Sequence, residues 1–180
     1  MKYHKTQIEG VTIIDLEPFE DHRGYFARAF CQADFHENGL DFQPVQANLS
    51  GNLKRGTLRG LHYQAAPHQE DKLVRAVRGA VFDVAVDLRP QSATYRQWFG
   101  TELSAENRRS LLIPKGCAHG YLTLTDDAET LYMVSQAYHP ESDRGLRWND
   151  PFCNVQWPFD PLVISDKDRQ WPDYKPESQK

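Results

Sequence analysis

The stretch AVFDVAVDL, residues 80–88, alternates residue by residue between two kinds of side chain. One set contains Phe82, Val84, Val86 and Leu88, and the other contains Val81, Asp83, Ala85 and Asp87. A period of two places the two sets on opposite faces of a β-strand. The stretch therefore predicts a strand whose Phe82 face is apolar and whose other face carries two carboxylates.

Short extended segments continue on both sides of this strand, separated by turns rich in Gly, Pro and Asn. One helix is expected, over Gln32–Asn38. The expected strands are 8–16, 25–30, 45–49, 57–64, 72–77, 80–88, 95–103, 110–113, 118–124 and 129–138. Many short strands favour an all-β jelly-roll barrel with an internal pocket and a few short helices. A β-sandwich without a cavity is the alternative.

Length and composition limit the class of protein. The chain has 180 residues and a net charge of −4, which fits one globular domain over residues 1–180 and gives no basic footprint for nucleic acid. No apolar run reaches the length of a membrane span. Three cysteines with no metal or redox spacing indicate reduced thiols and a cytoplasmic protein. The polar residues 171–180 are expected to be loosely held.

The segment LRGLHYQ, residues 58–64, carries the first candidate for chemistry. His62 can move a proton near neutral pH, although a structural role for one histidine in a strand is equally plausible. Strand parity puts Arg59 on the face opposite His62 unless the chain bulges, and Gly60 is a suitable bulge position.

A metal at His62 is disfavoured, because Gln64 stands where a second histidine ligand would be expected and His119 is distant in sequence. His62 is better explained as a general base that needs an orienting carboxylate. Asp168, in the segment SDKD, is one of several candidates, and an ordinary surface turn is the alternative for that segment.

Three further side chains extend this hypothesis. Tyr132 shares a strand face with Thr130 and Val134, which is either a polar pocket lining or an outer surface. His119 lies among small residues that allow close approach of a ligand. Asp83 is a hypothetical orienting partner for His119, and Lys72 is a further helper.

Taken together, these segments resemble the dTDP-4-dehydrorhamnose 3,5-epimerase family, a cofactor-free branch of the cupins. The matching segments are 21–24 (DHRG), 45–48 (VQAN), 58–64 (LRGLHYQ), 72–75 (KLVR), 81–87 (VFDVAVD), 103–107 (LSAEN), 113–120 (IPKGCAHG), 131–132 (LY), 148–151 (WNDP), 157–158 (WP) and 165–168 (SDKD).

The resemblance implies a cupin jelly-roll homodimer whose N-terminal segment crosses to the partner, with neither metal nor cofactor. It implies His62 as proton acceptor, Asp168 as its orienting carboxylate, Tyr132 as proton donor and Lys72 beside the C4 carbonyl of a nucleotide-linked 4-keto sugar. The implied substrate-binding positions are Arg23, Arg28, Gln46, Ala47, Asn48, Arg59, Lys72, His119, Tyr138, Asp143 and Lys167.

The chain departs from the family pattern at two positions. Arg28 stands where the family often has a glutamate at the nucleotide end, so a different base or sugar is an alternative, and Asp143 replaces a glutamate. Three hypotheses follow: an epimerase acting at C3, C5 or both, an isomerase that moves the ketone along the ring, and a non-catalytic cupin that only binds a nucleotide sugar.

Overall fold

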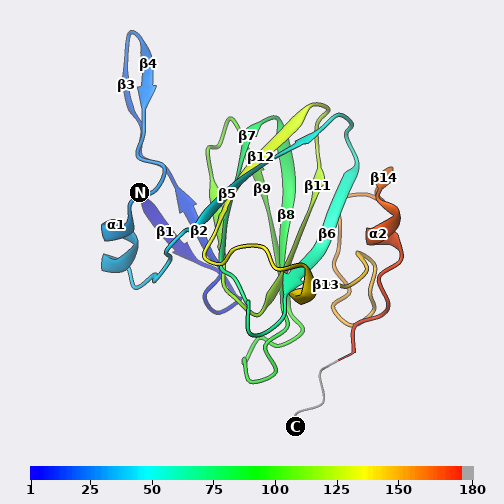
Figure 1. The fold of residues 1–180 in the computed structure, drawn as a ribbon. Helices are drawn as coiled ribbons and strands as arrows, with labels where there is room; N and C mark the ends of the chain where they lie inside the picture. Colours follow the sequence, from blue (N-terminus) through cyan, green and yellow to red (C-terminus); the bar gives the residue numbers. More distant parts are fainter. Residues whose placement is uncertain (176–180) are drawn as a thin grey trace.

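The structure is a computed structural model that describes residues 1–175, and two β-sheets dominate it (Figure 1). The first sheet has the strand order β1-β2-β10-β7-β12-β5, with every pair antiparallel. Its strands are β1 (Lys2–Lys5), β2 (Thr12–Asp15), β5 (Gln46–Asn52), β7 (Lys72–Arg78), β10 (Ser110–Ile113) and β12 (Ala128–Val134).

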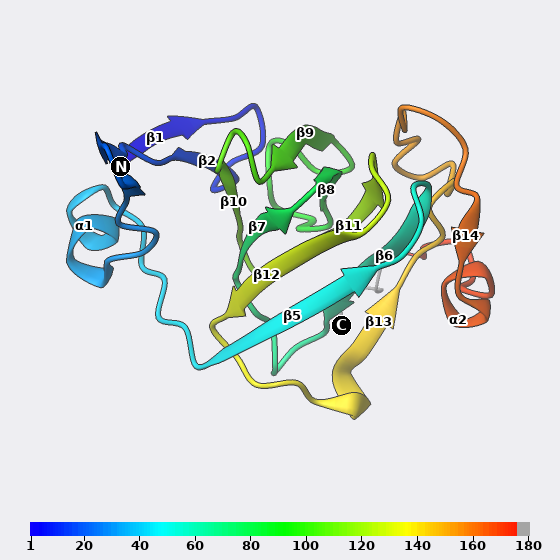
Figure 2. The same ribbon diagram turned by 90° about the horizontal axis from the view of Figure 1, so that it is seen from above.

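The second sheet has the order β13-β6-β11-β8-β9, and β14 pairs in parallel with β6. Its strands are β6 (Thr57–Gln64), β8 (Ala80–Asp87), β9 (Trp98–Ser104), β11 (Cys117–Thr123), β13 (Asp143–Gly145) and β14 (Val163–Ile164). Seen from above, β5 and β6 adjoin at one side and the two sheets face each other like the walls of a barrel (Figure 2). The expected all-β architecture with a few short helices is confirmed.

The alternation in β8 explains how the second sheet is sealed on both faces. Val81 and Ala85 face the first sheet and pack with Val74 and Leu111. Val84 and Val86 face outward, where Leu146 and the C-terminal segment cover them. Both faces of the strand are therefore buried, so its two carboxylates need hydrogen-bonding partners.

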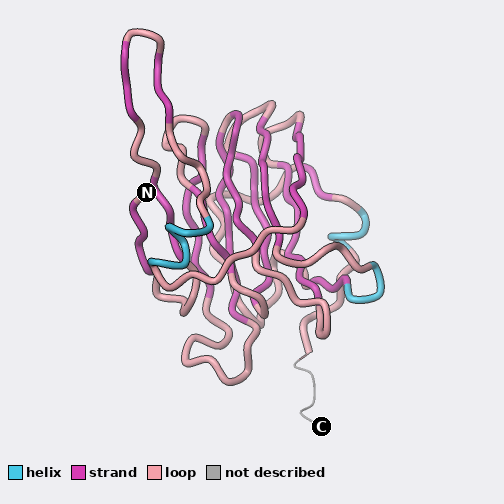
Figure 3. Tube along the Cα trace, turned by 60° about the vertical axis from the view of Figure 1, so that its left-hand side comes forward, coloured by secondary structure: helices cyan, strands magenta, loops and turns pink. Residues whose placement is uncertain are grey.

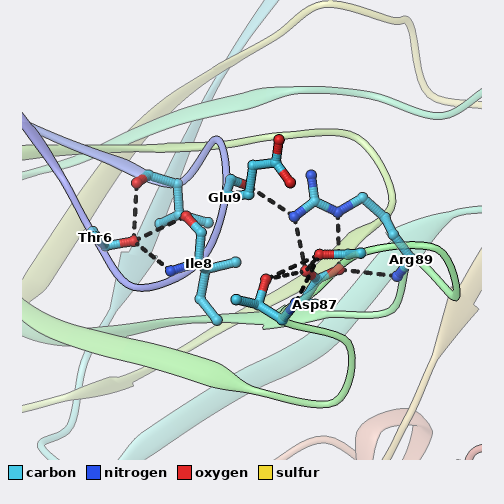
Figure 4. Close-up of polar contacts among 8 residues, drawn as sticks. Thr6, Ile8, Glu9, Asp87 and Arg89 are labelled. Atoms are coloured by element: carbon cyan, nitrogen blue, oxygen red, sulfur yellow. Dashed lines mark hydrogen bonds and ion pairs between the residues drawn. The ribbon is translucent and has the colours of Figure 1, made fainter.

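A hydrogen-bonded cluster ties the N-terminal turn to the end of β8 (Figure 4). The Asp87 carboxylate accepts hydrogen bonds from Arg89, Ser92 and Thr94. The Arg89 guanidinium also donates to the carbonyl of Glu9. This cluster holds the base of the first sheet against the second.

A two-stranded hairpin, β3 (Phe19–Asp21) with β4 (Gly24–Phe26), projects away from both sheets (Figures 1 and 3). The short helix α1 (Gln32–Glu37) follows it and buries Phe35 against Ile14 and Leu73 of the first sheet. Phe19 and Phe26 are 77% and 73% exposed, an unusual amount for aromatic side chains.

Several predicted boundaries are wrong for local reasons. The strand predicted over 8–16 begins only at Thr12, after a turn at Gly10 with φ +81°. The strand predicted over 95–103 begins at Trp98, after Arg96 adopts φ +71°. The strands predicted over 25–30 and 129–138 end at Phe26 and Val134, and the short strands β1, β3, β13 and β14 were not predicted.

The C-terminal region packs more closely than predicted. The segment SDKD forms the helix α2 (Asp166–Arg169) rather than a surface turn. Trp171 contacts Gly145, and the Tyr174 main-chain N–H donates to Asp150. The rest of the predicted loose tail, residues 176–180, lies outside the described residues. No helix within residues 1–175 is long and apolar enough to span a membrane.

Candidate active site

A cavity of about 540 Å³ lies between the two sheets. An adjoining compartment of about 350 Å³ shares four lining residues with it: His62, Lys72, Tyr132 and Lys167. His62 comes from β6 of the second sheet, whereas Lys72 and Tyr132 come from β7 and β12 of the first. A ligand in this space therefore meets an imidazole and a phenol contributed by two different walls.

His62 forms a close pair with Asp168. The distance from His62 Nε2 to Asp168 Oδ1 is 2.5 Å, and the Asp168 side chain is 5% exposed. A neutral imidazole that donates its Nε2–H to the carboxylate keeps its lone pair on Nδ1. The arrangement suits a general base whose tautomer is fixed by its partner.

The helix α2 holds Asp168 in place. Ser165 is its N-cap, and the Ser165 hydroxyl accepts a hydrogen bond from the Asp168 main-chain N–H. Burial raises the pKa of Asp168. The hydrogen bond and charge of His62, together with the Gly60 N–H, lower it by more, so the pKa of Asp168 lies below its usual value. Asp168 is thus an anion that can stabilise an imidazolium at His62.

A bulge brings Arg59 to the same cavity as His62. The pairing with β11 shifts register here, since His119 pairs with His62 but Tyr121 pairs with Arg59. Gly60 has φ +118°, and a Cβ at this position would lie 2.6 Å from the Cα of Gly120. Only glycine fits such a position. The predicted bulge at Gly60 is confirmed.

Neighbouring polar groups direct Arg59 into the cavity. Its Nε donates to Asn52 Oδ1 at 2.8 Å and its Nη2 to the Gly51 carbonyl at 3.1 Å. A guanidinium fixed by two bonds can present its remaining donors to a phosphate.

His119 lies beside His62 on the neighbouring strand β11, and it is buried whereas His62 is partly exposed. Its Nε2 lies 2.8 Å from Oδ1 of Asp83, whose side chain is fully buried. Asp83 is therefore close enough to orient His119, as the sequence suggested. The second oxygen, Oδ2, has no hydrogen-bond partner among the described residues.

The opposite wall carries Lys72 and Tyr132. In the pairing of β7 with β12, Lys72 lies opposite Val134, so Tyr132 is its diagonal neighbour on the same face. The face of β12 that contains Tyr132 thus lines the cavity rather than the outer surface. Burial is the main cause that raises the pKa of Tyr132, which keeps the phenol protonated at neutral pH.

The adjoining compartment contains most of the remaining predicted residues. Gln46 and Asn48 face it from β5, with Gln46 Nε2 donating to Asn48 Oδ1. The Tyr138 hydroxyl donates to Asp143 at 3.1 Å, and Lys167 forms an ion pair with the same carboxylate. The hydrogen bond that Lys167 donates to Asp143 is the main cause that raises the pKa of Lys167.

Three predicted residues are not brought to either compartment. Ala47 lies between Gln46 and Asn48, is exposed and points to the outer face of β5. Arg23 lies in the projecting hairpin and bonds Asp21. Arg28 follows the hairpin, where its guanidinium lies 3.4 Å from Asp34. Within the described chain these two arginines are separate from the cavity.

Sequence reasoning missed several lining residues. Ser50 continues the inward-facing series of Gln46 and Asn48, so the period of two was a usable signal. Tyr121 lies on the inward face of β11, and its hydroxyl lies 2.9 Å from Ser50 Oγ. Glu70 lines the adjoining compartment from the loop before β7, where no periodic pattern could reveal it.

One cluster among residues 1–175 brings together groups able to bind a metal: His68, His139 and Glu141. The two imidazole rings stack face to face, with centroids 3.6 Å apart and planes 10° apart. Ring lone pairs lie in the ring planes, so those of two parallel rings do not converge on one ion. His68 Nδ1 also lies 2.9 Å from Ser142 Oγ, so the cluster is already hydrogen-bonded.

Comparisons with known proteins give a consistent result. The family described as dTDP-4-dehydrorhamnose 3,5-epimerase matches residues 5–176. The dTDP-4-dehydrorhamnose 3,5-epimerase of Methanothermobacter thermautotrophicus is 49% identical over 173 residues, covering 94% of this chain and 92% of that protein.

Two solved structures are also similar. The crystal structure of dTDP-4-dehydrorhamnose 3,5-epimerase from Bacillus anthracis, with TDP and PPi bound, has a TM-score of 0.92 and 38% identity, covering 95% of this chain and 98% of that one. A 3'-monoepimerase from Streptomyces bikiniensis, in complex with dTDP-quinovose, has a TM-score of 0.86 and 34% identity, covering 94% and 86%. The resemblance in the sequence motifs and the cupin fold are confirmed, and the chain belongs to the dTDP-4-dehydrorhamnose 3,5-epimerase family.

Proposed function

We propose that the chain is a dTDP-4-dehydrorhamnose 3,5-epimerase, which inverts C3 and C5 of dTDP-4-dehydro-6-deoxy-D-glucose. The observation that supports this most strongly is the position of His62 and Tyr132 on different walls of one cavity. Inversion needs a base on one face of the sugar ring and an acid on the other.

The chemistry follows from these positions. His62 removes a proton from the carbon next to the C4 ketone. The electron pair of the broken C–H bond moves onto the ketone oxygen and forms an enolate. The Lys72 ammonium stabilises the developing negative charge. Tyr132 then donates its proton to the opposite face of the same carbon. C3 and C5 both adjoin C4, so one ketone serves both inversions.

Binding of the nucleotide is assigned to the cationic and polar residues around this centre. Arg59 and His119 lie beside His62 and suit the diphosphate. Tyr138 and Lys167, with Gln46 and Asn48, suit the nucleoside end in the adjoining compartment. The Tyr138 side chain is 55% exposed, which leaves a ring face free to stack on a base.

We also propose that the working unit is a homodimer with exchanged hairpins. Phe19 and Phe26 are exposed on the hairpin, and Val45 and Leu49 are 65% and 66% exposed at the edge of the first sheet. Apolar surface of this extent favours contact with a second copy. Arg23 at the hairpin tip would then reach the partner's cavity, where its charge suits a phosphate.

Mixing two inactive variants tests this exchange. Chains carrying Arg23→Ala and chains carrying His62→Ala, unfolded and refolded together, form mixed dimers with one intact cavity. Activity should return to about a quarter of the sites in an equal mixture. If Arg23 serves its own cavity, mixing restores nothing, and a monomer in analytical ultracentrifugation would contradict the dimer.

A single-centre epimerase is the second candidate, favoured by the similarity to a 3'-monoepimerase and by Arg28 at the nucleotide end. NMR of products from dTDP-, UDP- and GDP-linked 4-keto-6-deoxy sugars separates the possibilities. Inversion at both centres of the dTDP sugar supports the proposal, and inversion at one centre only supports the alternative. Binding without turnover would favour a non-catalytic cupin.

A cytoplasmic location, suggested by three unpaired cysteines, stays a prediction.

A further inference from the structure

A largely buried carboxylate stands next to the proposed enolate-stabilising cation. Glu70 Oε1 lies 3.0 Å from Lys72 Nζ, and the two side chains are 10% and 12% exposed. Among the described residues, this is the one ion pair that Lys72 makes. The position of the ammonium within the cavity therefore depends on Glu70.

The second oxygen of Glu70 is held by another buried side chain. Gln64 is 4% exposed, and its Nε2 donates to Glu70 Oε2 and to the Ala137 carbonyl, each at 3.1 Å. Its Oε1 accepts the main-chain N–H of His139 at 2.6 Å. The His139 N–H can only donate, so it fixes which end of the Gln64 amide points to Glu70.

These contacts make residue 70 an acceptor on both sides. One oxygen faces an ammonium and the other faces an amide NH₂, and both of those groups only donate. A carboxylate satisfies the two donors at once. A glutamine at this position would turn its own NH₂ toward either Lys72 or Gln64, leaving two donors face to face.

The same chain of contacts links the two ends of the site. Gln64 joins Glu70 to residues 137–139, and this segment includes Tyr138, which lines the adjoining compartment. Lys72 and Tyr132 line that compartment together with Glu70. The negative charge of Glu70 also contributes to the raised pKa of Tyr132, after burial and Tyr121.

We propose that Glu70 is a positioning residue, which holds the Lys72 side chain aimed at the C4 oxygen and couples it through Gln64 to the segment that carries Tyr138. The inference rests on the proposed function, because it gives Lys72 the enolate oxygen as its target. Glu70 acts through Lys72, so its loss should weaken an interaction that strengthens in the transition state.

The test is a double-mutant cycle on Glu70→Gln and Gln64→Glu. Glu70→Gln sets donor against donor, and Gln64→Glu sets a carboxylate against both the Glu70 carboxylate and the Ala137 carbonyl. Each single change should lower kcat about tenfold while KM changes less than about threefold. The double variant restores a donor–acceptor pair between residues 64 and 70. It should recover at least about half of the lost kcat.

Asp71→Asn serves as the matched control. Asp71 is the adjacent loop carboxylate, and its oxygens accept from the Lys115 N–H and the Ser135 hydroxyl rather than from Lys72. This change should lower the melting temperature with little effect on kcat. If Asp71→Asn lowers kcat as far as Glu70→Gln, the effect belongs to the loop and the positioning role is refuted.

Failure of this inference is separable from failure of the proposed function. A wild-type chain that does not epimerise the dTDP sugar overturns both. A wild-type chain that is active, with Glu70→Gln at the same kcat, overturns the role of Glu70 alone. Single losses that simply multiply in the double variant would also overturn it, since they show no coupling between residues 64 and 70.

Discussion

Replacing Asp168 with Asn tests the His62–Asp168 pair while leaving its shape nearly unchanged. The Gly60 N–H donates to Asp168 Oδ2 at 3.4 Å, and the other oxygen faces His62 Nε2 at 2.5 Å. An asparagine oriented to accept from Gly60 places its NH₂ against Nε2. The imidazole must then carry its hydrogen on Nδ1, the atom that serves as the base.

The size of the effect follows from the bond that is lost. A hydrogen bond to a charged group contributes about 1.5–3 kcal/mol, and a tenfold change in rate corresponds to about 1.4 kcal/mol. Removing the bond as the imidazolium forms should therefore lower kcat about 10- to 150-fold. The Asp168 side chain is 5% exposed, so solvent compensates little of this loss.

Turnover of the dTDP-linked 4-keto sugar, followed by NMR, measures kcat and KM for this variant. Asp166→Asn is the matched control, because Asp166 lies in the same helix but is exposed. The control should keep the wild-type kcat. A wild-type kcat in Asp168→Asn, with the histidine still required, would refute the assignment of Asp168 as the orienting carboxylate.

Three further outcomes are expected. Tyr132→Phe should lower formation of the inverted product about 100-fold or more while dTDP binding is kept, because only the donated proton is lost; unchanged product formation would point to the ketone-moving isomerase. Burial raises the pKa of Asp87, but hydrogen bonds from Arg89, Ser92 and Thr94 lower it to about 2. The pKa of Asp87 is lower in the folded chain than in the unfolded chain, so its contribution to stability is complete above about pH 4 and is lost as the pH falls through about 2. The free energy of unfolding should therefore fall by about 2 kcal/mol over this range. Denaturant titrations of the wild type and of Asp87→Asn at each pH measure this difference. Gly60→Ala should cost about 2–3 kcal/mol of unfolding free energy and lower activity as well, since its Cβ would meet Gly120 at 2.6 Å; wild-type stability would contradict the need for glycine at this bulge.

The sequence predicts the strands best where burial imposes a clear period. The alternation in β8 is recognisable because Asp83 and Asp87 lie on one face and the other face is apolar. The β6 strand could be recognised together with its bulge because Gly60 interrupts the parity between Arg59 and His62. The short strands β1 and β14 carry no such pattern. Their pairing with β2 and β6 is decided by tertiary contacts, which propensity does not encode.

The site is predictable where motifs place residues on inward-facing strand positions. His62, Lys72, Tyr132 and His119 all line the cavity for that reason. Ala47 was included with its neighbours, but alternation turns it outward. Glu70 lies in a loop, where no spacing pattern predicts its position. The positions of Arg23 and Arg28 relative to a cavity depend on where the hairpin lies in an assembly, which sequence spacing does not encode.

Solvent hydrogen exchange reports directly on proton abstraction by His62. The purified chain is incubated in D₂O with dTDP-4-dehydro-6-deoxy-D-glucose, and the deuterium at each sugar carbon is measured by NMR. We expect deuterium at both C3 and C5 with the wild-type chain, and at neither with His62→Ala. Inverted product without solvent deuterium, or equal incorporation by His62→Ala, would contradict proton abstraction by His62.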